Sequence, residues 1–234
     1  MTVRTFAVGA IAASMLAATL PAAASDPAPA ASPITIGEVR GIDSLVLSER
    51  RSWRISRTGA ENPAVIIYVI DAERLFAPVS AYCGYLSGMR GASGSGCRVV
   101  GVDTGAPLLR TRDLTPTVSA ARRDGTVDES AAPQGGGSER FERFILKELV
   151  PAAEADLPPA ASPRRVLLGH SFGGLLVLDM LRRHPLAFDD FVAIDPSLWW
   201  DRGSFTETLS AALAARALPH RPEPLHRHRR GAPA

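Results

Sequence analysis

The sequence is poor in lysine, cysteine and aromatic residues, and it contains no hydrophobic run as long as a membrane span. Lys147 is the only lysine among 26 basic residues, which outnumber the 24 acidic ones by two. So small an excess excludes a general basic surface for nucleic acid. Apolar residues make up 46% of the chain and charged residues 21%, values that exclude a disordered or collagen-like protein. The 234 residues suffice for one domain with tails.

The longest apolar run lies at the N-terminus, over residues 6–20, after the single charge of Arg4. It is shorter than the roughly 20 residues that a transmembrane helix needs. The small residues Ala22-Ala23-Ala24 then form a typical signal-peptidase site. We therefore predict a signal peptide over 1–24, a flexible leader over 25–35, and an exported, periplasmic or secreted protein without a stable membrane anchor. An uncleaved N-terminal anchor is the alternative.

Two cysteines, Cys83 and Cys97, lie in the predicted mature chain. Export permits a disulfide between them, but sequence spacing does not show whether the two sulfurs face each other. Two cysteines without a neighbouring histidine do not predict a zinc site, and we expect neither a metal nor a cofactor.

Strand and helix patterns alternate from about residue 36, which predicts an α/β fold with a mostly parallel sheet and helices on both faces. The unbroken β-branched run 65–70 predicts a strand that is covered on both sides. The expected strands are 44–48, 51–57, 65–70, 98–102, 165–169 and 191–194, and the expected helices are 74–89, one from 138 onward, 175–183 and 204–217.

Residues 103–136 form a long connection rich in turn residues, and connections of this length are usually functional or mobile. We expect this segment to border the substrate cleft. Its Gly135-Gly136-Gly137 triplet is not a phosphate-binding loop, because no Gly-Lys-Ser/Thr sequence follows it. In the helix after it, Phe141, Phe144, Ile145, Leu149 and Ala152 recur at helical spacing and predict a buried face.

The motif with the clearest chemistry is Gly169-His170-Ser171-Phe172-Gly173, which matches the G-x-S-x-G nucleophile elbow. It lies between an apolar strand pattern and an apolar helix pattern, as an elbow must. Such a turn exposes the serine hydroxyl at the carboxyl edge of the sheet and directs the next backbone N–H at an oxyanion. The alternative is a glycine-rich turn that only packs closely.

Several further segments accompany the elbow: Val69-Ile-Asp-Ala-Glu73, Arg110-Thr-Arg-Asp-Leu-Thr-Pro116, Gly136-Gly-Ser-Glu-Arg-Phe141 and Asp195-Pro-Ser-Leu-Trp-Trp-Asp201. With these segments the chain resembles the putative-esterase family of α/β-hydrolases, in its siderophore-esterase-like branch, over about residues 36–205. The resemblance implies an α/β-hydrolase domain over 36–217.

The resemblance also implies roles for individual residues. Ser171 would be the nucleophile, and the backbone N–H groups of Phe172 and Ala72 would form the oxyanion hole. The family usually has glycine where this chain has Ala72, so a positive φ there would strain the alanine. Arg110 and Arg112 are expected to meet an anionic substrate, with pairing to Asp113 or solvent as the alternative.

The C-terminus departs from the family pattern, in which the catalytic histidine lies on a loop after further strands. Residues 218–234 are instead dominated by Pro, Arg and His, which predicts a disordered tail and a fold that lacks its last strands. This composition is typical of G+C-rich DNA read in a shifted frame, so we expect a C-terminally incomplete hydrolase. The triad acid and histidine are not identifiable. His170 is expected to pack or hydrogen-bond locally, and His184 to be cationic at a helix end. His220, His226 and His228 are expected to lie in the solvated tail, with metal binding by the His-x-His pair as the alternative.

Three functions remain open at this point, of which the third is a tether, in which the arginines of the tail hold the protein on an acidic surface. The first is a secreted serine hydrolase that cleaves a carboxylic ester, with a siderophore-type ester as one candidate. The second is an inactive hydrolase-fold protein that only binds a ligand or partner. A small-molecule ester is the expected partner, and the sequence gives no indication of the oligomeric state.

Overall fold

A computed structural model describes residues 33–56, 63–89, 96–127, 132–159 and 161–215. The predicted signal peptide, most of the leader and the tail lie outside these residues. None of the helices in these ranges combines the length and apolarity that a membrane span requires. The described residues from Thr35 to Ala215 form one compact unit.

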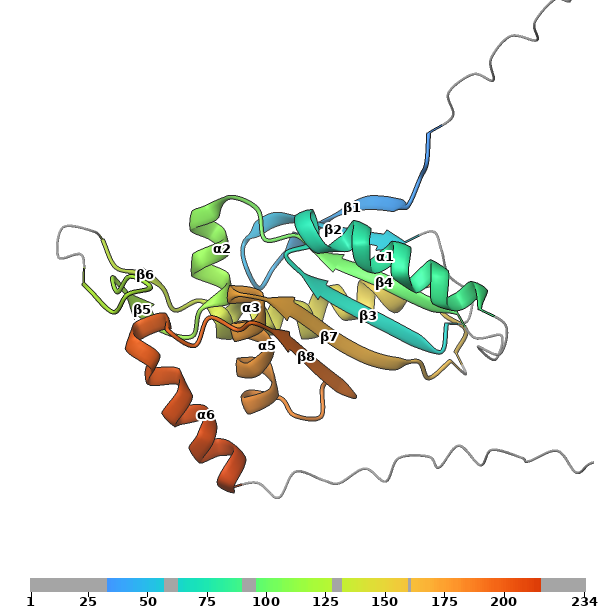
Figure 1. Ribbon diagram of the computed structural model, residues 1–234. Coiled ribbons are helices and arrows are strands. Elements are labelled where there is room, and N and C mark those ends of the chain that lie inside the picture. The colour runs from blue at the N-terminus through green and yellow to red at the C-terminus, as the bar shows by residue number, and fades with distance from the viewer. Residues whose placement is uncertain (1–32, 57–62, 90–95, 128–131, 160, 216–234) are drawn as a thin grey trace, which may run out of the picture. The chain divides into compact units, whose positions relative to one another are not determined.

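The central sheet has six strands in the order β1-β2-β4-β3-β7-β8 (Figure 1). The pairs β4–β3, β3–β7 and β7–β8 are parallel, whereas β1–β2 and β2–β4 are antiparallel. The strands are β1 (Gly37–Ser44), β2 (Glu49–Ser56), β3 (Val65–Ile70), β4 (Cys97–Val102), β7 (Arg164–His170) and β8 (Asp190–Ile194); β5 (Val118–Ser119) and β6 (Gln134–Gly135) form a separate ribbon. The mostly parallel sheet that the sequence predicts is confirmed.

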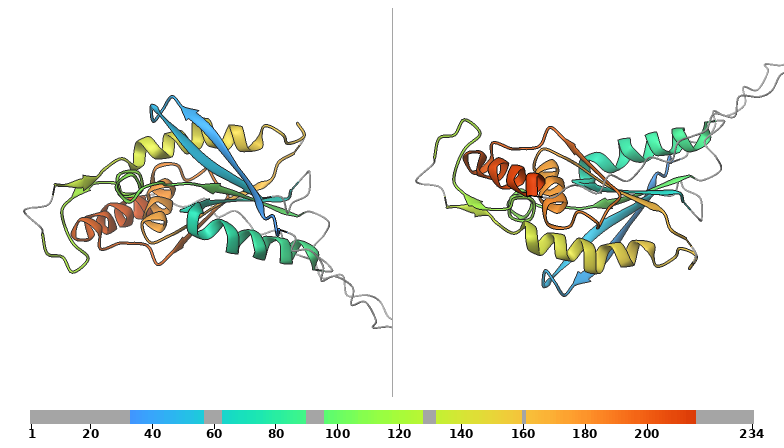
Figure 2. Two further views of the ribbon diagram at one scale, coloured as in Figure 1. Left: turned by 90° about the horizontal axis from the view of Figure 1, so that it is seen from above. Right: turned by 90° about the horizontal axis from the view of Figure 1, so that it is seen from below.

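Helices lie on both faces of this sheet (Figure 2). They are α1 (Ala72–Gly88), α2 (Pro107–Leu114), α3 (Ser138–Phe144), α4 (Val150–Glu154), α5 (Phe172–Arg183) and α6 (Ser204–Ala215), with a π-helical turn η1 (Ile145–Leu149) and a 3₁₀ turn η2 (Trp200–Gly203). α1 packs on one face through Phe76 and Cys83. α3, η1, α4 and α5 cover the other face, where the predicted stripe of Phe141, Phe144, Ile145 and Leu149 is buried.

The run 65–70 lies in the middle of the core, as its composition predicts. Ile66 and Tyr68 face the helices of one layer and Val69 faces α1, and all three are fully buried. Cys83 in α1 and Cys97 at the start of β4 form a disulfide with a Cα–Cα distance of 5.8 Å. The question that spacing left open is therefore answered: the two sulfurs face each other.

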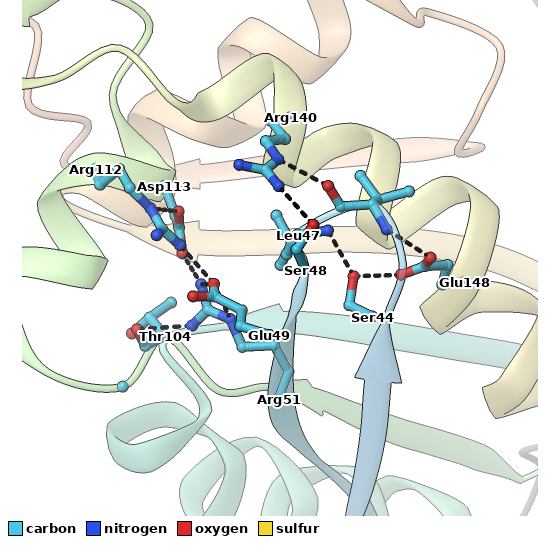
Figure 3. Close-up of polar contacts among 12 residues, drawn as sticks. Ser44, Leu47, Ser48, Glu49, Arg51, Thr104, Arg112, Asp113, Arg140 and Glu148 are labelled. Atoms are coloured by element: carbon cyan, nitrogen blue, oxygen red, sulfur yellow. Dashed lines mark hydrogen bonds and ion pairs between the residues drawn. The ribbon is translucent and has the colours of Figure 1, made fainter.

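Residues 44–48 do not form the predicted strand, and that prediction is wrong. Ser44 is the last residue of β1, residues 45–48 are the turn between β1 and β2, and Leu45 in this turn is 90% exposed. The carboxylate of Glu148 accepts hydrogen bonds from the backbone N–H groups of Leu45 (3.0 Å) and Val46 (2.9 Å) and from Ser44 Oγ (2.5 Å) (Figure 3). A group about 100 residues away in the sequence therefore decides the conformation of this apolar segment.

Glu148 lies in the π-helical turn η1. Pro151 follows and has no N–H to donate to the carbonyl four residues earlier, which disrupts regular α-helical bonding. Val150 N–H instead donates to the Ile145 carbonyl, five residues back. One continuous buried face is kept across this irregularity, since Ile145 and Leu149 are both fully buried.

Candidate functional site

Ser171 occupies a sharp turn from strand to helix. β7 ends at His170, and α5 begins at Phe172. The backbone of Ser171 has φ 58° and ψ −119°, a region that costs a non-glycine residue on the order of 1–3 kcal/mol. Strain of this kind persists where the surrounding structure enforces it, and it is concentrated at functional sites. The strained elbow that the motif predicts is present.

Two glycines make this turn possible. A Cβ on Gly169 would overlap the backbone carbonyl of Gly173 and lie 3.0 Å from the nitrogen of Gly174. A Cβ on Gly173 would lie 3.2 Å from Ile70 and 3.3 Å from Asp71 Oδ2. The helix start and the end of β3 therefore approach each other so closely that side chains on these glycines would not fit without movement.

The chain returns to Ser171 after β8. The Ser171 N–H donates to the Ile194 carbonyl (3.1 Å), and the Ser197 N–H donates to the Ser171 carbonyl (3.1 Å). The hydroxyl oxygens of Ser171 and Ser197 lie 3.0 Å apart, which is hydrogen-bonding distance. Between these contacts Asp195 has φ 41°, a second strained residue beside the elbow.

The end of β3 brings a carboxylate and a helix N-terminus next to the elbow. Asp71 is in the left-handed conformation (φ 59°, ψ 50°), and Ala72 is the first residue of α1. Ala72 does not have a positive φ, so alanine in place of the family's glycine causes no backbone strain there. The residue with the positive φ is Asp71. Ala72, in the first turn of α1, is 1% exposed.

Arg110 joins this carboxylate to the elbow. Its Nε and Nη2 atoms donate to the two oxygens of Asp71 at 2.6 and 2.8 Å. Thr104 Oγ1 donates to the same carboxylate at 2.9 Å. The guanidinium carbon of Arg110 lies 5.1 Å from the centroid of the Phe172 ring, a cation–π distance. The structure thus places Arg110 at the elbow, where a substrate contact is geometrically possible.

Phe172 also begins an aromatic cluster. Its ring centroid lies 5.6 Å from that of Trp199 and 5.2 Å from that of Trp200. The indole Nε1 of Trp200 donates to the Thr117 carbonyl at 3.1 Å. The residue after the serine is therefore in contact, through Trp200, with the long segment 103–136.

A cleft of about 610 Å³ lies between that segment and the start of α6. Residues 118–121, Val127 and Pro133 line one side, and Asp201, Arg202, Gly203, Ser204 and Glu207 line the other. Part of the segment 103–136 thus borders a cleft, but Ser171 is not among the lining residues, so the expected position beside the substrate cleft stays a prediction. The segment is also more regular than predicted, because it contains helix α2.

Arg112 lies in a different cluster from Arg110. Its Nε atom donates to Asp113 and its Nη2 atom to Glu49, each at 2.6 Å (Figure 3). These hydrogen bonds raise the pKa of Arg112, and the hydrogen bond from Arg112 is the main cause of a lowered pKa at Glu49. Arg51 binds the same Asp113 and is itself buried. Of the two alternatives for Arg112, the structure shows the pairing with Asp113.

The histidines among the described residues are His170 and His184. His170 is exposed at the end of β7. The hydroxyl of Ser171 instead forms a hydrogen bond with the hydroxyl of Ser197. His184 follows α5, where burial and then the charge of Arg183 lower its pKa. The expected cationic state of His184 is therefore disfavoured, because desolvation opposes the helix dipole. In the same ranges, no group of three or more Cys, His, Asp or Glu side chains is placed to hold a metal ion.

The sequence did not single out Asp71 or Ser197 as site residues. Each belongs to a segment that carried the resemblance, but their contacts with Arg110 and Ser171 arise from strand order and turn geometry. The only local signal was their position directly after buried strands, where the carboxyl ends of a parallel sheet converge.

This combination of a mostly parallel sheet, helices on both faces and a serine at a strand-to-helix elbow defines the α/β-hydrolase fold. An IroE-like serine hydrolase from Shewanella oneidensis has the same fold, with a TM-score of 0.68 and 27% identity over 78% of this chain and 57% of that one. The siderophore hydrolase EstA from Aspergillus nidulans has a TM-score of 0.66, with 24% identity over 86% of this chain and 70% of that one.

The chain belongs, within this fold, to the Putative esterase family, whose model matches residues 114–227. The siderophore triacetylfusarinine C esterase of Aspergillus fumigatus is 30% identical over 74% of this chain and 57% of its own length. The ferri-bacillibactin esterase BesA of Bacillus subtilis is 32% identical over 70% of this chain and 60% of its own. The chain thus spans about three-fifths of the length of these curated relatives, and it is similar to the siderophore-esterase branch.

Proposed function

We propose that this protein is a serine hydrolase that cleaves a carboxylic ester of the siderophore type through an acyl-enzyme on Ser171. The observation that carries the proposal is the strained backbone of Ser171 at the start of α5, with Gly169 and Gly173 on either side. The names of the relatives supply the substrate class, since both act on siderophores.

In the proposed reaction, Ser171 Oγ forms a bond to the ester carbonyl carbon. Its proton passes to a general base and then to the leaving oxygen, so that an alcohol departs and the acyl group stays on the serine. The backbone N–H groups of Phe172 and Ala72 are proposed to bind the oxyanion, because each lies at the start of a helix beside the elbow. Water then releases the acid by the same steps.

The test is covalent labelling of the full chain with a fluorophosphonate probe, together with hydrolysis of a p-nitrophenyl ester and of a siderophore-type ester. We expect labelling at Ser171, and loss of both labelling and hydrolysis by at least about 10³-fold in Ser171→Ala. Ser210→Ala, which changes an exposed serine in α6 outside the cleft, should behave as wild type. An unlabelled wild-type protein that is folded would contradict the proposal.

Arg110 is proposed to bind an anionic part of the substrate. Asp71 accepts hydrogen bonds from two of the five N–H donors of Arg110. The Arg110 guanidinium lies over the ring of Phe172, next to Ser171. In the same assays we expect Arg110→Ala to raise KM for anionic esters several-fold more than KM for neutral ones. Arg112→Ala, which changes the arginine held by Glu49 and Asp113, should not discriminate between them. Equal effects of the two substitutions would exclude this role of Arg110.

Export with cleavage after Ala24 is also proposed. The disulfide between Cys83 and Cys97 supports an oxidising compartment, since such bonds are rare in the reducing cytosol. The N-terminal sequence of the mature protein should begin at Ser25. A protein that retains Met1, or that is found only in the cytosol, would rule out this proposal.

Binding without turnover is the second candidate. It is favoured by the side-chain contact of Ser171, whose partner in the described residues is another serine and not a histidine. The labelling experiment separates the two functions. A protein that binds the siderophore-type ester but neither reacts with the probe nor hydrolyses the ester would support binding alone.

A further inference from the structure

Ser197 lies where it can control the orientation of the Ser171 hydroxyl. The two hydroxyl oxygens are 3.0 Å apart, and Ser197 is only 4% exposed. Its backbone is attached to the same residue, because the Ser197 N–H donates to the Ser171 carbonyl at 3.1 Å. Main chain and side chain of Ser197 thus both bind Ser171.

Two hydrogen bonds and one close packing contact fix the turn that carries Ser197. The Leu198 N–H donates to the Pro196 carbonyl (2.7 Å), and the Trp200 N–H donates to the Ser197 carbonyl (3.0 Å). In addition, Pro196 packs against the first turn of α5, where a Cβ on Gly174 would lie 3.1 Å from the Cα atom of Pro196. Gly174, which lies outside the G-x-S-x-G motif, is therefore the residue that lets this turn approach the elbow.

The approach also requires strain. Asp195 starts the turn with φ 41°, and Ser171 itself has φ 58°. Both conformations cost a non-glycine residue free energy, and an ordinary surface turn after β8 would need neither of them. Two strained residues that converge on one pair of hydroxyl groups indicate that their hydrogen bond has a purpose beyond packing.

We propose that Ser197 is a positioning residue for Ser171: its hydroxyl selects one rotamer of the Ser171 side chain and donates to Oγ as the Ser171 proton is withdrawn. This inference rests on the proposed nucleophilic role of Ser171. A hydrogen bond to a group that gains negative charge is worth about 1.5–3 kcal/mol, more than one between neutral partners. Loss of the hydrogen bond from Ser197 therefore slows the reaction of Ser171 more than it weakens binding of the probe or the ester.

The experiment compares Ser197→Ala and Ser197→Thr with wild type by fluorophosphonate labelling, ester hydrolysis and thermal unfolding of the full chain. We expect Ser197→Ala to lower the rate of inactivation and kcat about 10- to 100-fold, with KM and Tm nearly unchanged. Ser197→Thr keeps a hydroxyl and should restore most of the rate. Ser80→Ala is the matched control, because Ser80 is equally buried and its hydroxyl has no partner within the described part of the chain.

The outcomes separate this inference from the proposed function. If wild type is labelled and Ser197→Ala reacts at the same rate, the positioning role is overturned and the nucleophilic role stands. A rate loss that follows a lower Tm in both Ser197 variants, or that Ser80→Ala shares, would also overturn it. If folded wild type is not labelled at all, the proposed function fails and the inference fails with it.

Discussion

Replacing Gly169 by alanine is expected to lower the free energy of unfolding by about 3–5 kcal/mol and to abolish labelling of Ser171. The added methyl group would overlap the carbonyl of Gly173, and backbone atoms cannot move aside as the end of a flexible side chain can. β7 and α5 would have to separate, which would release the conformation of Ser171 between them. Urea unfolding and probe labelling of the purified variant measure the two effects.

Gly88→Ala is the control for this substitution. Gly88 is the last residue of α1, and a Cβ there would meet nothing within 4 Å. Because alanine favours a helix over glycine by roughly 0.5–1 kcal/mol, we expect this variant to be as stable as wild type or slightly more stable. If both alanine variants kept wild-type stability and labelling, the close contact at Gly169 would not be what shapes the elbow.

Glu142→Gln is expected to stabilise the protein at neutral and alkaline pH. Glu142 is fully buried in α3, and within the described residues neither of its carboxyl oxygens has a hydrogen-bond partner. Burial first, and the negative charge of Asp179 second, raise the pKa of Glu142 to about 9. Two basic side chains lie within 4 Å of Glu142 Oε2: Arg183 Nε at 3.7 Å and His184 Nε2 at 3.6 Å. Both distances exceed ordinary hydrogen-bond length.

The direction of the pH dependence follows from the raised pKa. Between pH 4.5 and about 9 the folded protein holds a proton on Glu142 that the unfolded chain has lost, so stability falls as pH rises through this window. One pKa unit corresponds to about 1.4 kcal/mol, and pH 7 lies 2.5 units above the ordinary value of 4.5, so the cost at pH 7 is about 3 kcal/mol. Glutamine stays neutral at every pH and avoids that cost.

Urea unfolding at pH 4.5 and pH 8 measures the effect. The two proteins should be about equally stable at the lower pH, and Glu142→Gln should be more stable by a few kcal/mol at the higher one. Glu139→Gln is the matched control on the same helix: its carboxylate is largely exposed and pairs with Arg183 at 2.8 Å, so the change should be within about 0.5 kcal/mol. A difference between wild type and Glu142→Gln that did not grow with pH would refute a neutral buried Glu142.

The parts of the fold that the sequence predicts correctly are those whose pattern is local. The run 65–70 was predictable as a central strand because it is short, rich in β-branched residues and apolar on both faces, as a strand covered on both sides requires. The turn at Ser171 was predictable because the glycines that it needs lie within the same five residues. The stripe on α3 and η1 was predictable because helical spacing alone places its members on one face.

The errors lie where distant groups decide the structure. The segment 44–48 has the composition of a strand, but its residues 45–48 form a turn, because Glu148 binds two of their backbone N–H groups. Helix α2 was missed because its polar side chains face an interior ionic cluster, in which Asp113 binds Arg51 and Arg112. The contact between Ser171 and Ser197 depends on a turn with positive φ at Asp195, a non-glycine residue, and no sequence pattern announces that conformation.

The aromatic cluster at the elbow has an optical consequence. Two of the three tryptophans, Trp199 and Trp200, lie against the ring of the residue that follows Ser171, whereas Trp53 is buried in β2 with the guanidinium of Arg40 over its ring. Intrinsic fluorescence is therefore weighted toward the neighbourhood of the serine. In a Trp53→Phe background, a change in emission on adding an ester or a chelated metal complex would report occupancy of the elbow without any label, and it would do so whether or not the protein turns the ligand over.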